Sequence, residues 1–595
     1  MSSAETAYLV RHALLRDAAY QLQLPGDRAR LHALVVDVIE SLSGGRPGEP
    51  PPLGAEQPTQ WTGLPIDAFA EALAEHARLS QSRGLEAARR LYLRRAAEQA
   101  DRQWRFDSAR MCWLEFAELA GAGDRGEALL MAGNSAYRCS RHRDAEPLFM
   151  RALDEARRLG SRRLEGRALL GFATVLLEIG RPAPAEDTLR EALAIQRAEG
   201  DRRSEAVSLG NLANLCTNGS RVAEAESLYL EALSLHAALR DRNAEGRVLG
   251  NLGLLYRDTG RPDEARRAFE RALALDRETG SRRSEGRALA SMAGLLRETG
   301  RAEEAERFYL QAQVINREVG DRHGEGALLG NLALLYAETA RKTLAEETLA
   351  QAIAMNEDVG DRRSEGIARG NLANLFKDTG RIDDARREYA RSLELHRAVG
   401  NRRFEAFALA GSADLLATQG RPDEAEALLR EALVLHRASG DRRGEGVALG
   451  SLGRLELLRG RSARALECLE EALVVDRQAA NRRSEGIALG LLALVHLDLG
   501  RLDEADAALA SALALARATA DRESESFHLA SLAQLRLSQG RPDDAKEAWL
   551  DSAAIVAEIG ESGIPDPLVA RVREACARAG IPVVGPKPAP EQSHP

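Results

Sequence analysis

The sequence predicts an all-α protein, a right-handed α-solenoid of helix–turn–helix repeats preceded by a small helical segment. Two observations support this fold class. A 40-residue pattern recurs without insertion through most of the 595 residues, and charged residues reach 29% while aromatic residues reach only 4%. The abundance of Ala, Leu, Glu and Arg favours helix. A chain of this length needs no separate globular cores when each repeat packs only on its neighbours.

The repeat is visible when two stretches are aligned. Residues 241–280, DRNAEGRVLGNLGLLYRDTGRPDEARRAFERALALDRETG, return at residues 361–400 as DRRSEGIARGNLANLFKDTGRIDDARREYARSLELHRAVG. We count eleven such repeats over residues 121–560, and residues 66–120 have the pattern of degenerate repeats. Internal repetition at this period is the signature of stacked supersecondary units.

Each repeat contains the pattern of two amphipathic helices. Apolar stripes at helical spacing occupy both halves of the repeat at residues 241–280: Leu249, Leu252, Gly253 and Tyr256, then Ala265, Phe269 and Ala272. Gly260 predicts the end of the first helix, because a glycine adopts the left-handed conformation that closes a helix. Pro262 predicts the start of the second, where a missing N–H costs nothing.

Two further positions support the helix pair. Residues that cap helix N-termini stand where each first helix begins, namely Asp201, Asp241, Asp321, Asp361, Asp441, Asp521, Asn401, Asn481, Ser161 and Ser281. The position of Gly253 holds Gly or Ala in every repeat. A larger side chain there would overpack the contact with the paired helix by about 1–3 kcal/mol.

These patterns resemble the tetratricopeptide repeat, with L-G-x-x-Y in the first helix, a glycine, and A-x-x-x-[FY]-x-x-A in the second. The 40-residue period and the phrase G-D-R-x-x-E-G…N-L-[GA] resemble the long-helix variant of kinesin light chains and of the G-protein modulators that orient spindles. The resemblance covers about three quarters of the chain. It implies a solenoid whose concave groove binds a protein or peptide, without identifying that partner.

The segments outside the array have their own character. Residues 1–43 resemble the end of the winged-helix region in bacterial signal-transduction ATPases that carry C-terminal repeats. The residues matching that family's phrase are Arg11, His12, Ala13, Leu14, Asp17, Ala18, Ala19 and Tyr20, while Val10 replaces an aromatic. Residues 44–65 are rich in Pro and Gly and predict a linker. Residues 561–580 predict a capping helix, and residues 581–595 a disordered tail.

Composition excludes several function classes. The net charge of −9 offers no basic field for nucleic acid. We find no P-loop lysine, and the five cysteines show no paired spacing for zinc or disulfides. Neither a signal peptide nor an apolar run long enough to cross a membrane is present, so we expect a cytoplasmic protein without a membrane partner. His236, His396 and His436 share one repeat position without any metal-binding motif. We expect no cofactor, no metal and no enzymatic activity.

The candidate binding residues follow from the resemblance, which places one face of each first helix in the groove. In this register the face carries Asn134, Asn211, Asn214, Asn251, Asn331, Asn371 and Asn374. An Asn side chain can pair with the main chain of an extended peptide. The alternative is that these side chains bond to the next repeat and hold the helices in register.

Three basic residues, Arg257, Arg297 and Lys377, lie near the end of the same face. They could pair with acidic groups of a ligand, but each has an adjacent carboxylate, so a solvated surface is an equal alternative. Arg at the position of Arg261 and Glu at that of Glu245 recur in nearly every repeat. Identical contacts of this kind predict ion pairs between repeats, because a specific ligand would break the symmetry.

The preferred function is an adaptor that binds an extended protein segment along repeats from about residue 121 to 440. The alternative is a regulatory sensor arm that controls a catalytic partner, such as an ATPase, kinase or cyclase, through the N-terminal segment. The sequence does not fix the oligomeric state, although a capping helix mildly favours a monomer.

Overall fold

The computed structural model describes residues 23–54, 63–219, 221–339, 341–519, 521–559 and 567–581. Every regular element in these residues is a helix, which confirms the all-α prediction. The residues that carry the N-terminal resemblance, between 11 and 20, lie outside the described residues. The chain divides into two compact units, one ending at Leu212 and the other beginning at Ala213, so each is described by itself.

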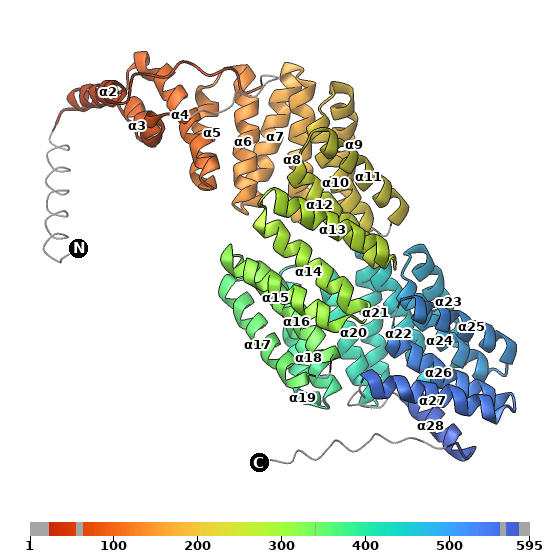
Figure 1. The fold of residues 1–595 in the computed structure, drawn as a ribbon. Helices are drawn as coiled ribbons and strands as arrows, with labels where there is room; N and C mark the ends of the chain where they lie inside the picture. Colours follow the sequence, from red (N-terminus) through yellow and green to blue (C-terminus); the bar gives the residue numbers. More distant parts are fainter. Residues whose placement is uncertain are drawn as a thin grey trace, which may run out of the picture. The chain divides into compact units, whose positions relative to one another are not determined.

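Helices alternate along the repeats, as the predicted pairs require (Figure 1). We call the first helix of each repeat helix A and the second helix B. The A helices are α6 (Ala122–Arg138), α8 (Arg162–Glu178), α10 (Arg202–Asn218), α12 (Arg242–Asp258), α14 (Arg282–Glu298), α16 (Arg322–Glu338), α18 (Arg362–Asp378), α20 (Arg402–Thr418), α22 (Arg442–Leu458), α24 (Arg482–Asp498) and α26 (Arg522–Ser538). The B helices are α7 (His142–Leu159), α9 (Pro182–Glu199), α11 (Val222–Ala238), α13 (Pro262–Glu278), α15 (Ala302–Glu318), α17 (Lys342–Val359), α19 (Ile382–Ala398), α21 (Pro422–Ser439), α23 (Ser462–Gln478), α25 (Leu502–Ala518) and α27 (Pro542–Ile559).

Close approach of the paired helices explains the small residue in each A helix. A Cβ placed on Gly253 would lie 2.5 Å from the ring of Phe269, and one on Gly453 would lie 2.5 Å from Leu469. Phe269 and Leu469 are fully buried. The prediction of a tight contact at this position is therefore confirmed, since any added side chain would displace a core residue of helix B.

Of the residues predicted to cap the A helices, the aspartates do so and the serines and asparagines do not. The side chains of Asp201, Asp241, Asp321, Asp361, Asp441 and Asp521 each accept a hydrogen bond from a backbone N–H in the first helical turn, at 3.0 to 3.2 Å. Ser161, Ser281, Asn401 and Asn481 make no such bond, so the prediction is wrong for these four. Asn481 shows one reason: its amide donates instead to Asp476 and to Ser484.

The recurring Arg and Glu residues form ion pairs, as predicted. Arg261 bonds Glu226 of the preceding B helix at 2.7 Å and stacks 4.3 Å from the centre of the Tyr256 ring. Arg341 and Arg381 repeat this arrangement. The buried Glu285 binds Arg277 from the preceding repeat, which ties neighbouring repeats together.

The A helices lie on the inner side of the array in each compact unit. Consecutive A helices such as α16 and α18, or α22 and α24, pack against one another, and among the described residues the B helices of consecutive repeats do so less. Since the A helices approach one another more closely, the stack curves toward them. The exposed positions of the A helices therefore form the candidate groove.

The ends of the array are covered by additional helices. At the N-terminal side these are α2 (Pro25–Leu42), the short 3-10 helices η1 (Pro65–Phe69) and η2 (Arg83–Leu85), and α3 (Ala70–Leu79), α4 (Glu86–Arg102) and α5 (Phe106–Leu119). Tyr92 donates a hydrogen bond to Glu40 of α2, and the N–H of Leu53 donates to Asp124 at 2.9 Å. Of the predicted linker, residues 44–54 thus lie against the helices, and Pro65 at its end already belongs to η1.

At the other end, α28 (Pro567–Arg578) packs on α26, where Val572 and Cys576 join a small core with Ala533 and Trp549. The described residues contain no helix that is long and apolar enough to cross a membrane. They also contain no cluster of His, Cys, Asp or Glu that could hold a metal ion.

Candidate functional site

Two of the predicted asparagines bond to one another across neighbouring A helices. The Asn251 amide of α12 donates to the Asn214 carbonyl oxygen of α10 at 3.1 Å. The Tyr229 hydroxyl of α11 donates to the same oxygen at 2.5 Å. These contacts are of the kind that fixes helix register, the alternative that the sequence left open.

Of the five remaining asparagines, two form hydrogen bonds within the described part of the chain and three do not. Asn374 accepts a hydrogen bond from Tyr389, and Asn211 donates to Thr174 at 3.5 Å. Asn331 of α16 is exposed and Asn371 of α18 is half-buried. Neither of these two side chains, nor that of the half-buried Asn134, has a hydrogen-bond partner among the residues that the structure describes. Asn331 and Asn371 therefore keep free amide donors and acceptors on the inner face of the C-terminal unit.

The three predicted basic residues are all paired with carboxylates. Arg257 bonds Asp258 and lies 3.6 Å from Glu298, while Arg297 bonds Glu338 of the next A helix. Lys377 bonds Asp414 of α20 at 2.7 Å. The structure thus places these cations in ion pairs within the groove wall.

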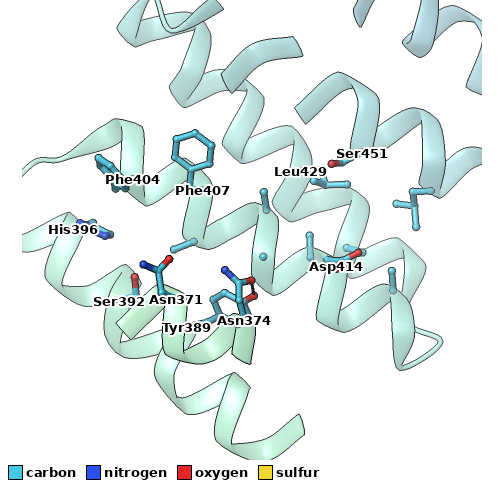
Figure 2. A pocket seen from close by; sticks show the side chains of 18 of the residues that line it. Asn371, Asn374, Tyr389, Ser392, His396, Phe404, Phe407, Asp414, Leu429 and Ser451 are labelled. Atoms are coloured by element: carbon cyan, nitrogen blue, oxygen red, sulfur yellow. Dashed lines mark hydrogen bonds between the residues drawn. The ribbon is translucent and has the colours of Figure 1, made fainter. Parts of the chain in front are cut away.

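A cavity of about 540 Å³ lies on the same inner face, where α18, α20 and α22 meet α19 and α21 (Figure 2). Its volume is within the range of ligand pockets, about 300–1,000 Å³. Asn371 and Asn374 are the two predicted residues that line it. Its other polar lining comes from Tyr389, Ser392, His396, Asp414, Ser451 and Arg454, and its apolar lining includes Ile367, Phe404, Phe407, Leu429 and Leu455.

Asp414 holds the polar end of this cavity. One of its carboxylate oxygens accepts from Lys377 and the other from Arg454 of α22, so a single acid joins three consecutive A helices. Burial opposes ionisation, but the charges of Arg454 and Lys377 outweigh it and lower the pKa of Asp414 below its ordinary value. The carboxylate is therefore ionised at neutral pH and fully engaged.

The cavity coincides with a break in the repeat pattern. Among the repeats beginning at residues 161 to 521, the one at 401–440 alone has Phe at position 404, Ser at position 412 and Asp at position 414. The position of Ser412 is Leu, Met or Phe in the others, and Leu332, Leu372 and Leu452 are buried there. The features that all repeats share do not reveal Phe404, Phe407 or Asp414, although Phe404 and Asp414 are visible in the sequence as residues found in one repeat alone.

The fold and this inner face define an α-solenoid with a hydrogen-bonding groove. Five segments match the tetratricopeptide repeat, residues 124–198, 204–278, 285–358, 364–437 and 404–478, of which the last two overlap, and a second form of the same repeat matches residues 251–318. Because the matches span more than half of the chain, the protein belongs to the tetratricopeptide repeat family. Residues 455–539 also match anaphase-promoting complex subunit 5.

Solved structures give a more distant likeness. The chain is 15% identical to a Rap protein complexed with competence and sporulation factor, over 60% of this chain and 98% of that one, with a TM-score of 0.41. It is 16% identical to a chain of the APC/C hetero-tetramer Cut9–Hcn1, over 83% of this chain and 97% of that one, with a TM-score of 0.36. It is 18% identical to BtubC (BKLC) from P. vanneervenii, over 36% of this chain and 91% of that one, with a TM-score of 0.32. A search of curated protein sequences gave no match.

Proposed function

We propose that this protein is a cytoplasmic scaffold that binds an extended segment of a partner protein along the inner face of its A helices, and that it does not act as an enzyme. The observation that carries the proposal is the pair of free amides at Asn331 and Asn371, which lie on consecutive A helices of one compact unit. The second of them borders the cavity.

Free amides on a groove suit an extended chain. Each Asn side chain offers both donor and acceptor groups, so it can pair with a peptide N–H and C=O whatever the side chains of the peptide are. Main-chain pairing of this type supplies affinity, while pockets for individual side chains supply specificity. The amides supply the first of these requirements and the adjacent cavity can supply the second.

The remaining predicted residues have a supporting role in this proposal. Asn214, Asn251 and Asn374 are bonded to neighbouring side chains, and Arg257, Arg297 and Lys377 are bonded to carboxylates. The contacts of Asn251, Arg297 and Lys377 join one A helix to the next, and that of Asn374 joins the two helices of its repeat, so they support the spacing of the groove. We therefore expect the free pair, rather than the bonded set, to contact the partner.

The test is affinity purification from the native cell extract with mass spectrometry. The bait is the full chain, compared with the double variant Asn331→Ala, Asn371→Ala. A matched control, Gln311→Ala, Gln351→Ala, removes two exposed amides from the B helices α15 and α17. We expect a partner that both the wild type and the control recover and that the groove variant loses at least tenfold. Equal recovery by all three baits would contradict the proposal.

A further inference from the structure

The cavity beside Asn371 has a continuous row of aromatic rings along one wall. The rings of His396 and Phe404 lie 5.6 Å apart between centroids, those of Phe404 and Phe407 5.8 Å, and those of Phe407 and His436 5.3 Å. Figure 2 shows His396 next to Phe404, and Asn371 across the opening from Phe407. Such a wall favours a flat aromatic group, which can pack edge-on or offset against several rings.

Part of this wall is left uncovered. Phe407 is 37% exposed, although an aromatic ring gains stability from burial. The repeat that supplies it also departs from its neighbours at residues 404 and 414, both of which line the cavity, and at residue 412 of the same helix. A feature that serves only to stack repeats would recur in each of them, whereas a ligand that is bound once requires a local exception.

An unpaired acceptor belongs to His396, the first ring of this row. His396 is 1% exposed, and its ring donates a hydrogen bond to the Gly366 carbonyl, which leaves Nδ1 as the acceptor. Nδ1 is buried and has no hydrogen-bond partner. Burial and the nearby charge of Arg363 lower the pKa of His396, so the ring is neutral at pH 7. Buried polar residues with an unpaired atom, such as Asp276 and Asn356, occupy the same position in other repeats, so the local feature is that His396 lines this cavity.

The charges around the cavity argue against a cationic guest. Both oxygens of Asp414 are already bonded, one to Lys377 and the other to Arg454. A lysine or arginine entering the cavity would therefore find no free carboxylate and would meet two cations. A neutral side chain encounters neither penalty.

We infer that the cavity receives a tryptophan or tyrosine side chain from the segment bound along the groove, with its N–H or O–H donated to His396 Nδ1 and its ring against Phe404 and Phe407. The inference rests on the proposed function, because Asn371 would pair with the main chain of the same segment. It adds the chemical class of the anchoring residue. Phenylalanine fits the same wall but leaves the buried acceptor unpaired, so it binds less tightly.

The test begins with a random twelve-residue peptide library selected on the full chain. Peptides recovered on the wild type are then titrated against two glycine variants. A Cβ on Gly370 of α18 meets only Ser392, at 3.4 Å, so Gly370→Leu grows into the cavity without displacing the core. The control is Gly250→Leu, at the same repeat position of α12, where a Cβ has no neighbour within 4 Å.

We expect the recovered peptides to share Trp or Tyr at one position, to lose at least tenfold in affinity for Gly370→Leu, and to keep their affinity within threefold for Gly250→Leu. Replacing the shared residue by Phe should weaken binding to the wild type about fivefold, since one hydrogen bond is lost. With His396→Phe that preference should disappear, and the Gly366 carbonyl keeps its bond from Ser392 at 2.7 Å. Thermal unfolding of each variant confirms that it is folded.

The outcomes separate this inference from the proposed function. Peptides that bind the groove but show no aromatic preference, or bind Gly370→Leu as tightly as the wild type, overturn the anchor pocket and leave groove binding intact. If the library gives no binder, N-acetyl-L-tryptophanamide at millimolar concentration is the direct probe, followed by ligand-observed NMR. No saturation transfer from the wild type, or equal transfer from wild type and Gly370→Leu, would also overturn the inference.

Discussion

A single buried position on the B helices carries titratable groups in several repeats. It is polar in most repeats and in most of these lies against a glycine near the start of the A helix in its own repeat. The residues at this position in consecutive repeats are Gln196, His236, Asp276, Asn316, Asn356, His396, His436 and Asp476. Two of the eight are acids, and burial raises their pKa values, to about 6 for Asp276 and to about 7 for Asp476.

The first prediction concerns Asp476, which is 1% exposed. Its carboxyl has a higher pKa in the folded state than in the unfolded chain, so the stability it contributes is complete below about pH 4 and is lost as pH rises through 7. Asp476→Asn introduces the residue that two other repeats have at this position, Asn316 and Asn356. Because Asn does not ionise, the variant should not lose stability as the pH rises. We expect the free energy of unfolding at pH 8 to rise by about 4 kcal/mol.

The measurement is the urea midpoint of wild type and variant at pH 5 and pH 8. The exposed Asp503 supplies the control, because Asp503→Asn should change neither midpoint appreciably. A variant that gains no more at pH 8 than at pH 5 would show that Asp476 does not titrate as described.

The second prediction concerns the residue that ends each B helix. Gly160, Gly200 and Gly400 have positive φ, and Ala480 adopts the same conformation with φ of 51°. A side chain in this left-handed region costs about 1 kcal/mol. Ala480→Gly should therefore raise the stability of the array by about 1 kcal/mol despite its greater chain entropy. Calorimetry checks the gain, and Gly400→Ala should produce a loss of similar size.

At the scale of helices, buried glutamates link each repeat to the one before it. Glu445 is 3% exposed and its oxygens bind Arg437 of α21 and Arg442 of α22. Sequence analysis predicted these pairs, because a residue repeated at a 40-residue period reports contacts between neighbours. The aspartate caps, the small residues opposite Phe269 and the ion pairs of Arg261 were predictable for the same reason.

The third prediction contrasts a buried and an exposed pair. Glu445→Ala removes two charge-assisted hydrogen bonds to a buried carboxylate, while Arg437 and Arg442 stay partly exposed, so it should cost about 1.5–3 kcal/mol. Glu431, half-exposed, bonds Arg397 at 2.9 Å, and Glu431→Ala should cost less than about 1 kcal/mol. Chemical unfolding measures both; similar costs would mean that burial does not determine the strength of these pairs.

At the scale of the C-terminal unit, repeats far apart in the chain come into contact. Arg443 at the start of α22 bonds Asp258 at the end of α12 at 3.0 Å, and Arg482 lies 3.3 Å from where a Cβ of Gly260 would be. The stack therefore curls until its edges meet. Neither this contact nor the cavity could be predicted from the sequence. The repeated pattern determines how neighbouring repeats pack, whereas these features depend on the curvature that builds up over several repeats.

The fourth prediction tests this long-range pair. Arg443→Asp places two carboxylates together and should increase hydrogen exchange in residues 441–450 and 250–260, with little change elsewhere. The exchanged pair Asp258→Arg, Arg443→Asp should restore protection in both segments, since the charges are again opposite. Exchange measured by mass spectrometry reports each segment separately. A single variant that leaves both segments protected would contradict a stabilising contact.

The claim that the inner face binds an extended segment is tested most directly by hydrogen exchange of the full chain with and without a recovered partner or peptide. The account predicts new protection in the A helices α16, α18 and α20, at and around Asn331, Asn371 and the cavity, with the B helices α15, α17 and α19 unchanged on their exposed faces. Protection confined to the B helices, or to the segments before α6, would contradict it and would place the binding surface outside the groove.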